Sequence, residues 1–232
     1  MKDYNKELVI IGENWNDSNP WLLGDQFDTV MNYGVAYRAV SFFAKSKFTC
    51  EEFTQKLVNL LMTYSDPINE QMFNFLDTHD TERFLYLANE DETCLKNALA
   101  FLYGYIGVPC IFYGTEIGLS GGMDPDSRKT FPWKEELWNH QLLSYIKRLI
   151  SLRKAEVAIR KGTITFLSSA ELFIMKRSYE GDNIYIYIYI IINTTNKKQT
   201  IPIQIQNEVS QELLSGKAAN SMIPANSSYY LR

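Results

Sequence analysis

Short apolar runs alternate with amphipathic stretches over the first two thirds of the chain. Leu8–Ile11 is a continuous apolar run and Phe73–Leu76 is apolar except at Asn74. Such runs are typical of strands buried on both faces of a parallel sheet. The stretches between them carry apolar residues at helical spacing. Alternation of strands and helices predicts an α/β fold whose parallel strands are joined by right-handed crossovers.

The boundaries of these elements follow from the same pattern. We expect strands at 8–11, 26–31, 73–76 and 108–113, and helices at 35–47, 50–65, 91–106 and 136–155.

The pattern changes near Gly162, after which only strands are expected. These are predicted at 163–167, 172–178, 184–192, 199–205 and 229–231. Glu180–Asn183 has the composition of a hairpin turn. Residues 184–190 alternate Ile and Tyr, which predicts a core strand with a half-exposed tyrosine face; an aromatic sugar-binding ladder is the less favoured interpretation. We therefore expect two domains, 1–161 and an antiparallel β-sandwich at 162–232.

Composition narrows the class of protein. The chain has 232 residues, of which 46% are hydrophobic, enough to bury a sizeable core. Its net charge of -4, with dispersed Lys and Arg, gives no reason to expect nucleic acid or an anionic membrane as partner. The chain shows neither an export signal nor an apolar run long enough to span a bilayer. We therefore expect a cytoplasmic protein.

The cysteines are too few and too far apart for a disulfide framework or a clustered metal site. Cys50, Cys94 and Cys110 each lie in an apolar setting. We expect all three to be reduced thiols in the core.

Carboxylates follow the two apolar runs directly. Glu13 comes just after the first run, and Asp77 and Asp80, with His79 between them, come after the second. The carboxyl ends of parallel strands are where α/β folds hold their catalytic groups. These acids are therefore the first candidates for a site.

Five motifs in order resemble the α-amylase family of glycoside hydrolases. They are Gly12-Glu13-Asn14-Trp15, Asp25 through Tyr33, Leu76 through Arg83, Val108 through Glu116, and Gly121 through Arg128. The last motif resembles the neopullulanase, cyclomaltodextrinase and maltogenic amylase subgroup. The resemblance implies a (β/α)₈ barrel followed by a β-sandwich, with this chain beginning at the fifth barrel strand, so that residues 1–161 would hold the fifth to eighth strands.

That register leaves out one catalytic group. The family's nucleophile is an Asp in a Gly-x-Arg-x-Asp pattern, and no such pattern occurs in these 232 residues. A retaining glycosidase needs two carboxyl groups about 5 to 5.5 Å apart, one as nucleophile and one as proton donor. We therefore expect the chain to be inactive by itself.

The resemblance assigns roles to the remaining candidates. Glu13 matches the general acid/base, for which partial desolvation would raise the pKa of the carboxyl; the alternative is an ordinary surface salt bridge. Asp80 matches the acid that stabilises the transition state, with capping of the next turn as the alternative. His79 matches a sugar-binding histidine, and a purely structural histidine is its alternative.

Aromatic and loop residues complete the predicted site. Trp15 and Tyr33 match aromatics beside the acid/base, where a ring face suits a glucose ring; core packing is nearly as good an interpretation. Asp124 and Arg128 match sugar-binding loop residues, and an ion pair that only shapes the loop is an equal alternative. We interpret three further charged residues, Glu82, Arg83 and Glu116, as structural partners of one another.

Two positions depart from the family pattern, and two strand edges lack partners. Asn14 replaces an aliphatic residue and Asn16 a frequent His, which affects the rim of the cleft rather than its catalytic groups. Half a barrel has open edges at 8–11 and 108–113, and open edges favour association. Self-association through these edges is expected.

The resemblance thus implies part of a retaining hydrolase of α-1,4 and also α-1,6 linkages in maltodextrins, cyclodextrins or pullulan. Its partner is an α-glucan, and it needs no cofactor or metal ligands of its own, although a full-length enzyme could bind Ca²⁺. Two alternatives remain open: a non-catalytic carbohydrate-binding remnant, and one half of a split enzyme.

Overall fold

A computed structural model describes residues 2–182 and 184–232. Its parallel strands are short, with β1 at Ile11–Gly12, β2 at Thr29–Val30, β3 at Phe73–Asn74 and β4 at Val108–Pro109. β1 pairs with β2 and β3 with β4, and a parallel bridge from Met31 to Phe73 joins the two pairs. The strands therefore lie side by side in chain order, as the βα pattern predicts.

Helices follow the strands. They are α1 (Tyr33–Ala39), which continues into a π-helix at Val40–Ala44, α2 (Cys50–Leu61), α3 (Asp66–Asn69), α4 (Phe84–Leu87), α5 (Glu92–Gly104), α6 (His140–Ala155) and α7 (Val157–Lys161). Short 3₁₀ helices lie at Asn19–Trp21, Thr115–Ile117, Asp126–Arg128 and Glu135–Leu137. The long helices predicted from periodicity are confirmed, with shifted ends.

Local capping explains where two of these helices begin. Thr49 and Glu52 form a capping box at α2, in which each side chain bonds the backbone N–H of the other residue. The Asp91 carboxylate accepts hydrogen bonds from the backbone N–H groups of Thr93 and Cys94 at the start of α5. Side-chain oxygens thus satisfy N–H groups that have no partner within the helix.

A four-stranded antiparallel sheet follows, in the order β10-β7-β6-β5. Its strands are β5 (Thr163–Leu167), β6 (Phe173–Gly181), β7 (Ile184–Asn193) and β10 (Ser227–Leu231). A second antiparallel pair joins β8 (Gln199–Thr200) to β9 (Met222–Ile223). The predicted hairpin is confirmed by the pairing of Gly181 with Ile184, although Asn183 of the predicted turn lies outside the described residues.

Three strand predictions need correction. The run 8–11 is not buried, because Val9 is 68% exposed and only Ile11–Gly12 pairs; the strand lies at the edge of the sheet, where one side has no neighbour among the described residues. The strand predicted at 108–113 ends at Pro109. The strand predicted at 199–205 stops at Thr200, and Pro202 precedes a helical turn, α8 (Ile203–Gln206).

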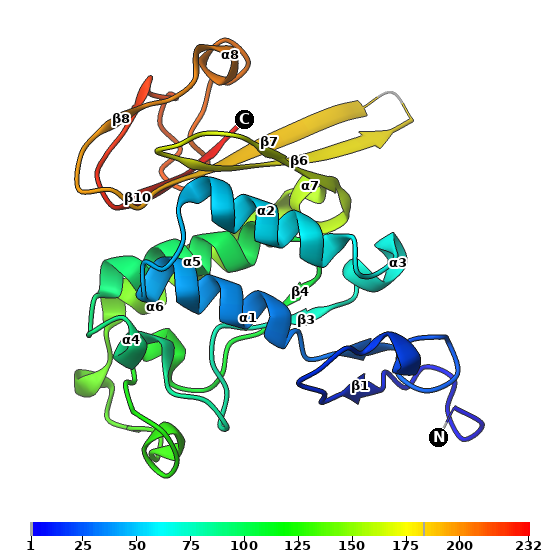
Figure 1. Ribbon diagram of the computed structural model, residues 1–232. Coiled ribbons are helices and arrows are strands. Elements are labelled where there is room, and N and C mark those ends of the chain that lie inside the picture. Colours follow the sequence, from blue (N-terminus) through cyan, green and yellow to red (C-terminus); the bar gives the residue numbers. More distant parts are fainter. Residues whose placement is uncertain (1, 183) are drawn as a thin grey trace.

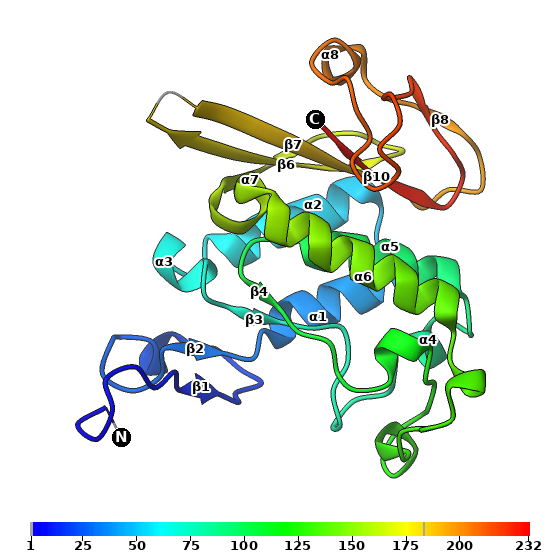
Figure 2. The ribbon, with the colours of Figure 1, turned by 180° about the vertical axis from the view of Figure 1, so that it is seen from behind.

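Helices α2, α5 and α7 lie against one face of the antiparallel sheet, and the segment containing β1 lies away from that sheet (Figures 1 and 2). One hydrophobic cluster spans the boundary at residue 162, since Phe53 of α2 and Phe101 of α5 pack against Phe173 of β6. The tyrosines of β7 differ along the strand: Tyr185 is exposed, whereas Tyr189 is buried. The predicted half-exposed face is therefore confirmed only at the start of β7.

Two arginines bind the carboxyl end of α5. Arg153 of α6 donates to the carbonyls of Tyr103 and Tyr105, and Arg177 of β6 donates to Gly104 O at 2.8 Å. Cations at this end of a helix bond its last carbonyls and balance its dipole. Burial lowers the pKa of Arg177 to about 9, so the side chain stays charged at neutral pH. Helix and sheet are therefore held together by charge as well as by apolar contact.

The cysteines are all free thiols. Cys50 is buried, whereas Cys94 and Cys110 are half-buried. The predicted reduced state is confirmed, and the predicted core position holds fully for Cys50 alone.

Candidate active site

The candidate residues lie where the parallel strands end. Glu13 follows β1, Tyr33 follows β2 and begins α1, and two loops complete the set: the β3 loop, residues 77–83, and the β4 loop, residues 110–130. Parallel strands bring their carboxyl ends to one edge of the sheet. The loops after different strands therefore meet there.

Glu13 is held by aromatic side chains. The hydroxyl of Tyr33 donates to Glu13 Oε1 at 2.9 Å, and the ring of Trp15 stacks on the Tyr33 ring with centroids 3.9 Å apart. Phe75 packs edge-on against the same tyrosine. Tyr33 is buried and Trp15 is 44% exposed. Core packing is therefore right for Tyr33, whereas Trp15 keeps a surface that a ligand can reach.

The pKa of Tyr33 also depends on the second candidate acid, Asp80. Burial raises the pKa of its hydroxyl above the ordinary value, and the hydrogen bond to Glu13 and the charges of Glu13 and Asp80 raise it further. The charge on one group shifts the pKa of another through the Coulomb interaction between them. One phenol thus lies within the electrostatic reach of both carboxylates.

The expected desolvation of Glu13 is absent from this chain. Its side chain is exposed, because β1 is an edge strand and the residues before it are exposed as well. The described residues orient the Glu13 carboxylate through the hydrogen bond from Tyr33, and they leave it exposed to solvent.

The Asp80 carboxylate contacts two charged or polar side chains, Arg128 and His79. Arg128 Nη2 donates to Asp80 Oδ1 at 2.6 Å, and His79 Nε2 lies 3.3 Å from Oδ2. Arg128 Nε also lies 3.3 Å from Asp124 Oδ1. The ion pair considered as an alternative for Asp124 and Arg128 is therefore present, and it extends to Asp80. All four side chains are partly exposed, so a ligand can reach them.

Threonines, rather than Asp80, shape the turn of the β3 loop. The backbone N–H of Asp80 donates to Thr78 Oγ1, and that of Thr78 donates to Thr81 Oγ1. The bonds recorded for the Asp80 carboxylate go to Arg128 and His79. Its capping alternative is therefore wrong for the described residues, and the carboxylate points to charged side chains.

Asp77, the first acid after β3, has a structural place. It is 3% exposed and accepts hydrogen bonds from Phe84 N and Thr115 Oγ1. Burial raises its pKa, against the lowering effect of these bonds and of Arg83. Asp77 therefore ties the start of α4 to the β4 loop instead of facing a ligand.

The predicted mutual pairing of Glu82, Arg83 and Glu116 is wrong. Arg83 is fully buried and donates to two carbonyls, Ser127 O at 2.9 Å and Tyr113 O at 2.7 Å. No ion pair is recorded among the three residues in the part of the chain that the structure describes.

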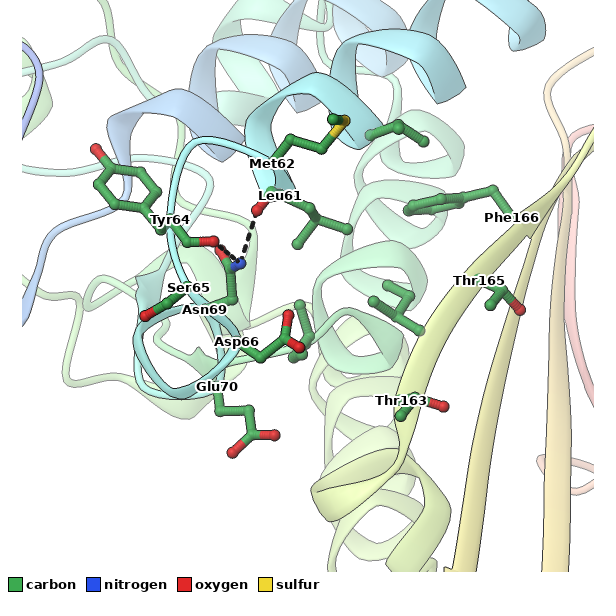
Figure 3. A pocket seen from close by; sticks show the side chains of 13 residues that line it. Leu61, Met62, Tyr64, Ser65, Asp66, Asn69, Glu70, Thr163, Thr165 and Phe166 are labelled. Atoms are coloured by element: carbon green, nitrogen blue, oxygen red, sulfur yellow. Dashed lines mark hydrogen bonds between the residues drawn. The ribbon is translucent and has the colours of Figure 1, made fainter. Parts of the chain in front are cut away.

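A groove of about 840 Å³ lies away from the candidate site, between the end of α2, α3 and β5. Figure 3 shows Asn69 bonded there to the carbonyls of Leu61 and Tyr64. Asn69 precedes β3 and Ile106, which also lines the groove, precedes β4. The groove is therefore at the amino ends of these strands and contains no candidate residue.

Residues 2–182 and 184–232 contain neither a metal-binding cluster nor a membrane-spanning helix. No cluster of three or more His, Cys, Asp or Glu side chains has the geometry to hold a metal ion. No helix in those ranges is long and apolar enough to cross a membrane.

Comparison with known families fits this arrangement. The family model for the catalytic domain of alpha amylase matches residues 1–139. The chain belongs to the alpha-amylase family. The resemblance inferred from its motifs is thereby confirmed.

Curated relatives in this family carry the expected subgroup names. A cyclomaltodextrinase of Thermoanaerobacter pseudethanolicus is 39% identical over 87% of this chain and 34% of its own length. Neopullulanase 2 of Thermoactinomyces vulgaris is 34% identical over 88% of this chain and 35% of its own length. The chain thus spans about a third of the length of these relatives.

Solved structures agree. A cyclomaltodextrinase structure superposes with a TM-score of 0.88 at 32% identity, covering 100% of this chain and 41% of the other. A cyclic maltosyl-maltose hydrolase from Arthrobacter globiformis, in complex with its cyclic substrate, gives 0.86 at 27% identity, covering 99% of this chain and 50% of the other. The alpha-amylase family fold therefore accounts for nearly every residue of this chain.

Proposed function

We propose that this chain supplies the acid/base and the transition-state-stabilising side of a retaining α-glucan hydrolase site, while the nucleophile comes from outside these 232 residues. The observation that carries the proposal is Tyr33, which bonds Glu13 and lies within electrostatic reach of Asp80. In this role Glu13 protonates the leaving oxygen and later activates water. Asp80 binds sugar hydroxyls more tightly as the oxocarbenium-like transition state forms.

The other candidates then bind the glucan. Trp15 offers an exposed ring face for a glucose unit, and His79 contributes a ring nitrogen beside Asp80. Arg128, with Asp124, presents a planar fork of donors to the sugar hydroxyls. The substrates are maltodextrins, cyclodextrins or pullulan, with α-1,4 and also α-1,6 linkages; the named activities of the relatives support this class.

The fold assignment belongs to the same proposal. Residues 1–161 form the fifth to eighth strands of a (β/α)₈ barrel, and residues 162–232 form a β-sandwich domain. The parallel order β1 to β4 and the antiparallel sheet from Thr163 onward support it. The shared hydrophobic cluster makes the two parts a packed unit rather than loosely linked domains.

The isolated chain tests the missing nucleophile. We expect no release of glucose or maltose from cyclodextrin or pullulan by the purified chain, because Glu13 has no attacking carboxylate opposite it. Sugar release that disappears in Glu13→Gln would contradict the proposal.

A gain of activity is the complementary test. The chain can be fused to the part of the Thermoanaerobacter pseudethanolicus cyclomaltodextrinase that precedes the matched region; we call this protein the fusion. It should hydrolyse cyclodextrin through Glu13 and Asp80. Mixing the two halves as separate chains distinguishes a split enzyme, which regains activity, from a binding remnant, which binds maltoheptaose in calorimetry and stays inactive.

We further propose that the isolated chain self-associates. Within residues 2–182 and 184–232, β1 pairs only with β2 and β4 only with β3. Val9 and Val108 beside these free edges are exposed. Unpaired edges with apolar side chains favour pairing with another chain.

A further inference from the structure

We infer that Arg83 is a positioning residue, which sets the Arg128–Asp80 pair of the candidate site without touching the glucan. This inference rests on the proposed function, since it concerns how that site is held. Arg83 ends the β3 loop and directly precedes α4, and its side chain is completely buried. A buried arginine needs partners for its charge and its donors, and its partners here all lie on the β4 loop.

The contacts of Arg83 join two loops. Its Nε donates to Ser127 O at 2.9 Å and its Nη1 donates to Tyr113 O at 2.7 Å. Its backbone N–H donates to Gly121 O at 2.9 Å. The guanidinium also lies 4.1 Å from the ring centroid of Phe112. Through its side chain and its backbone N–H, Arg83 therefore holds the beginning, middle and end of the β4 loop.

Arg128, the residue after Ser127, connects the anchored β4 loop to the candidate site. Ser127 is fully buried, and its hydroxyl donates to His79 O at 3.0 Å. Arg128 Nε donates to the same carbonyl at 3.2 Å, and its Nη2 reaches Asp80. Arg83 fixes the Ser127 peptide, so it fixes the origin of the Arg128 side chain. Asp80 then receives its guanidinium partner in one orientation.

Only arginine suits this position. Its planar fork reaches carbonyls of two different loop segments while stacking on an aromatic ring. A lysine at 83 could keep the charge near Asp77 and Glu116, whose charges favour the protonated Arg83, but its ammonium cannot reproduce both bonds and the stacking. The conservative variant therefore removes the positioning while keeping the charge.

The two histidines provide a direct readout. The chain contains His79, which contacts Asp80, and His140, whose ring lies near Glu135 O. Their ring signals can be followed by NMR in the histidine-labelled chain. We expect Arg83→Lys to shift the His79 signals in the same direction as Arg128→Lys, because both variants loosen Arg128 from Asp80. The His140 signals should not move.

Arg153→Lys is the matched control. Arg153 is also largely buried and also donates to backbone carbonyls, but its partners lie at the end of α5. The Arg153→Lys variant should lower the free energy of unfolding without moving the His79 signals. If Arg83→Lys does not fold, Ser127→Ala breaks the hydroxyl bond to His79 O without removing a charge, and the same shift is expected.

Binding of maltoheptaose by the isolated chain tests whether the positioning affects function. Arg83→Lys should weaken it on the order of tenfold, the effect of losing about one charged hydrogen bond, whereas Arg153→Lys should leave it unchanged. Unmoved His79 signals in folded Arg83→Lys or Ser127→Ala would overturn the inference. If the His79 signals move while the unmodified chain binds no maltoheptaose, the positioning role stands and glucan binding by the isolated chain fails.

Discussion

The hydroxyl of Tyr33 donates a 2.9 Å hydrogen bond to Oε1 of Glu13, although the two residues follow different strands. Trp15 lies flat against the same tyrosine ring. Because Tyr33 is buried and Glu13 is exposed, the tyrosine is the fixed member of the pair. The position of the candidate proton donor is therefore set by the start of α1.

Removing this hydroxyl should affect activity more than folding. Tyr33→Phe keeps the ring and its stacking on Trp15, so the free energy of unfolding should fall by only about 1 kcal/mol. Activity of the fusion on cyclodextrin should fall on the order of tenfold, because Glu13 loses its orienting bond. Tyr37→Phe, a change in an exposed tyrosine that also contacts Trp15, is the control. Equal activity in both variants would argue against this role for Tyr33.

Arg177 is expected to hold helix and sheet together. It is almost fully buried and donates to Gly104 O and Gly162 O. Arg177→Met would leave these carbonyls without their partner, and we expect a loss of about 3–5 kcal/mol in the free energy of unfolding. Urea denaturation measures it, with the exposed Arg160→Met as control. A loss below about 1 kcal/mol would show that water replaces the arginine.

The buried thiols should make stability depend on pH. Burial raises the pKa of Cys50 and of Cys94 to about 11, above the value of about 8.5 in an unfolded chain. The unfolded state then releases protons first as pH rises, so stability should fall between about pH 8.5 and 11.

Thiol labelling checks the same shift at pH 8. About a quarter of unfolded thiols are thiolates at this pH, against roughly one in a thousand for a pKa of 11. Both cysteines should therefore label far more slowly in the folded chain than in denaturant. Fast labelling of Cys50 in the native chain would contradict its burial.

The free edges of β1 and β4 should govern association. We expect sedimentation of the isolated chain to show oligomers across micromolar concentrations. Val9→Lys or Val108→Lys should shift the profile to monomer, because a charge at an edge opposes pairing. Met62→Lys changes a more exposed apolar residue away from both edges and should leave the oligomer intact. A strictly monomeric unmodified chain would contradict the proposal.

The sequence predicted the elements better than their surroundings. Thr163–Leu167 was predicted to the residue because strict alternation marks a strand locally. The strand predicted at 199–205 failed after Thr200, since Pro202 precedes a helical turn in which Ile205 is buried and Ile203 is exposed. Periodicity cannot distinguish these outcomes when tertiary contacts choose between them.

The candidate site shows the same limit. Motif position led to Glu13 and Asp80, and both act on Tyr33, the first through a hydrogen bond and the second through its charge. The role of Arg83 could not be predicted, because its partners are backbone carbonyls of a loop 30 to 44 residues away and leave no mark in side-chain type. The exposure of Glu13 depends on whether β1 has a neighbour on its free side, which local pattern does not report.

The most direct test is the rate of maltose release from cyclodextrin by the fusion and by its Glu13→Gln variant. If Glu13 is the acid/base, the variant should lose on the order of 10²- to 10⁴-fold in kcat while remaining folded. Glu7→Gln, a change in a nearby exposed acid, should retain full activity. A folded, active fusion whose rate is unaffected by Glu13→Gln would contradict the account.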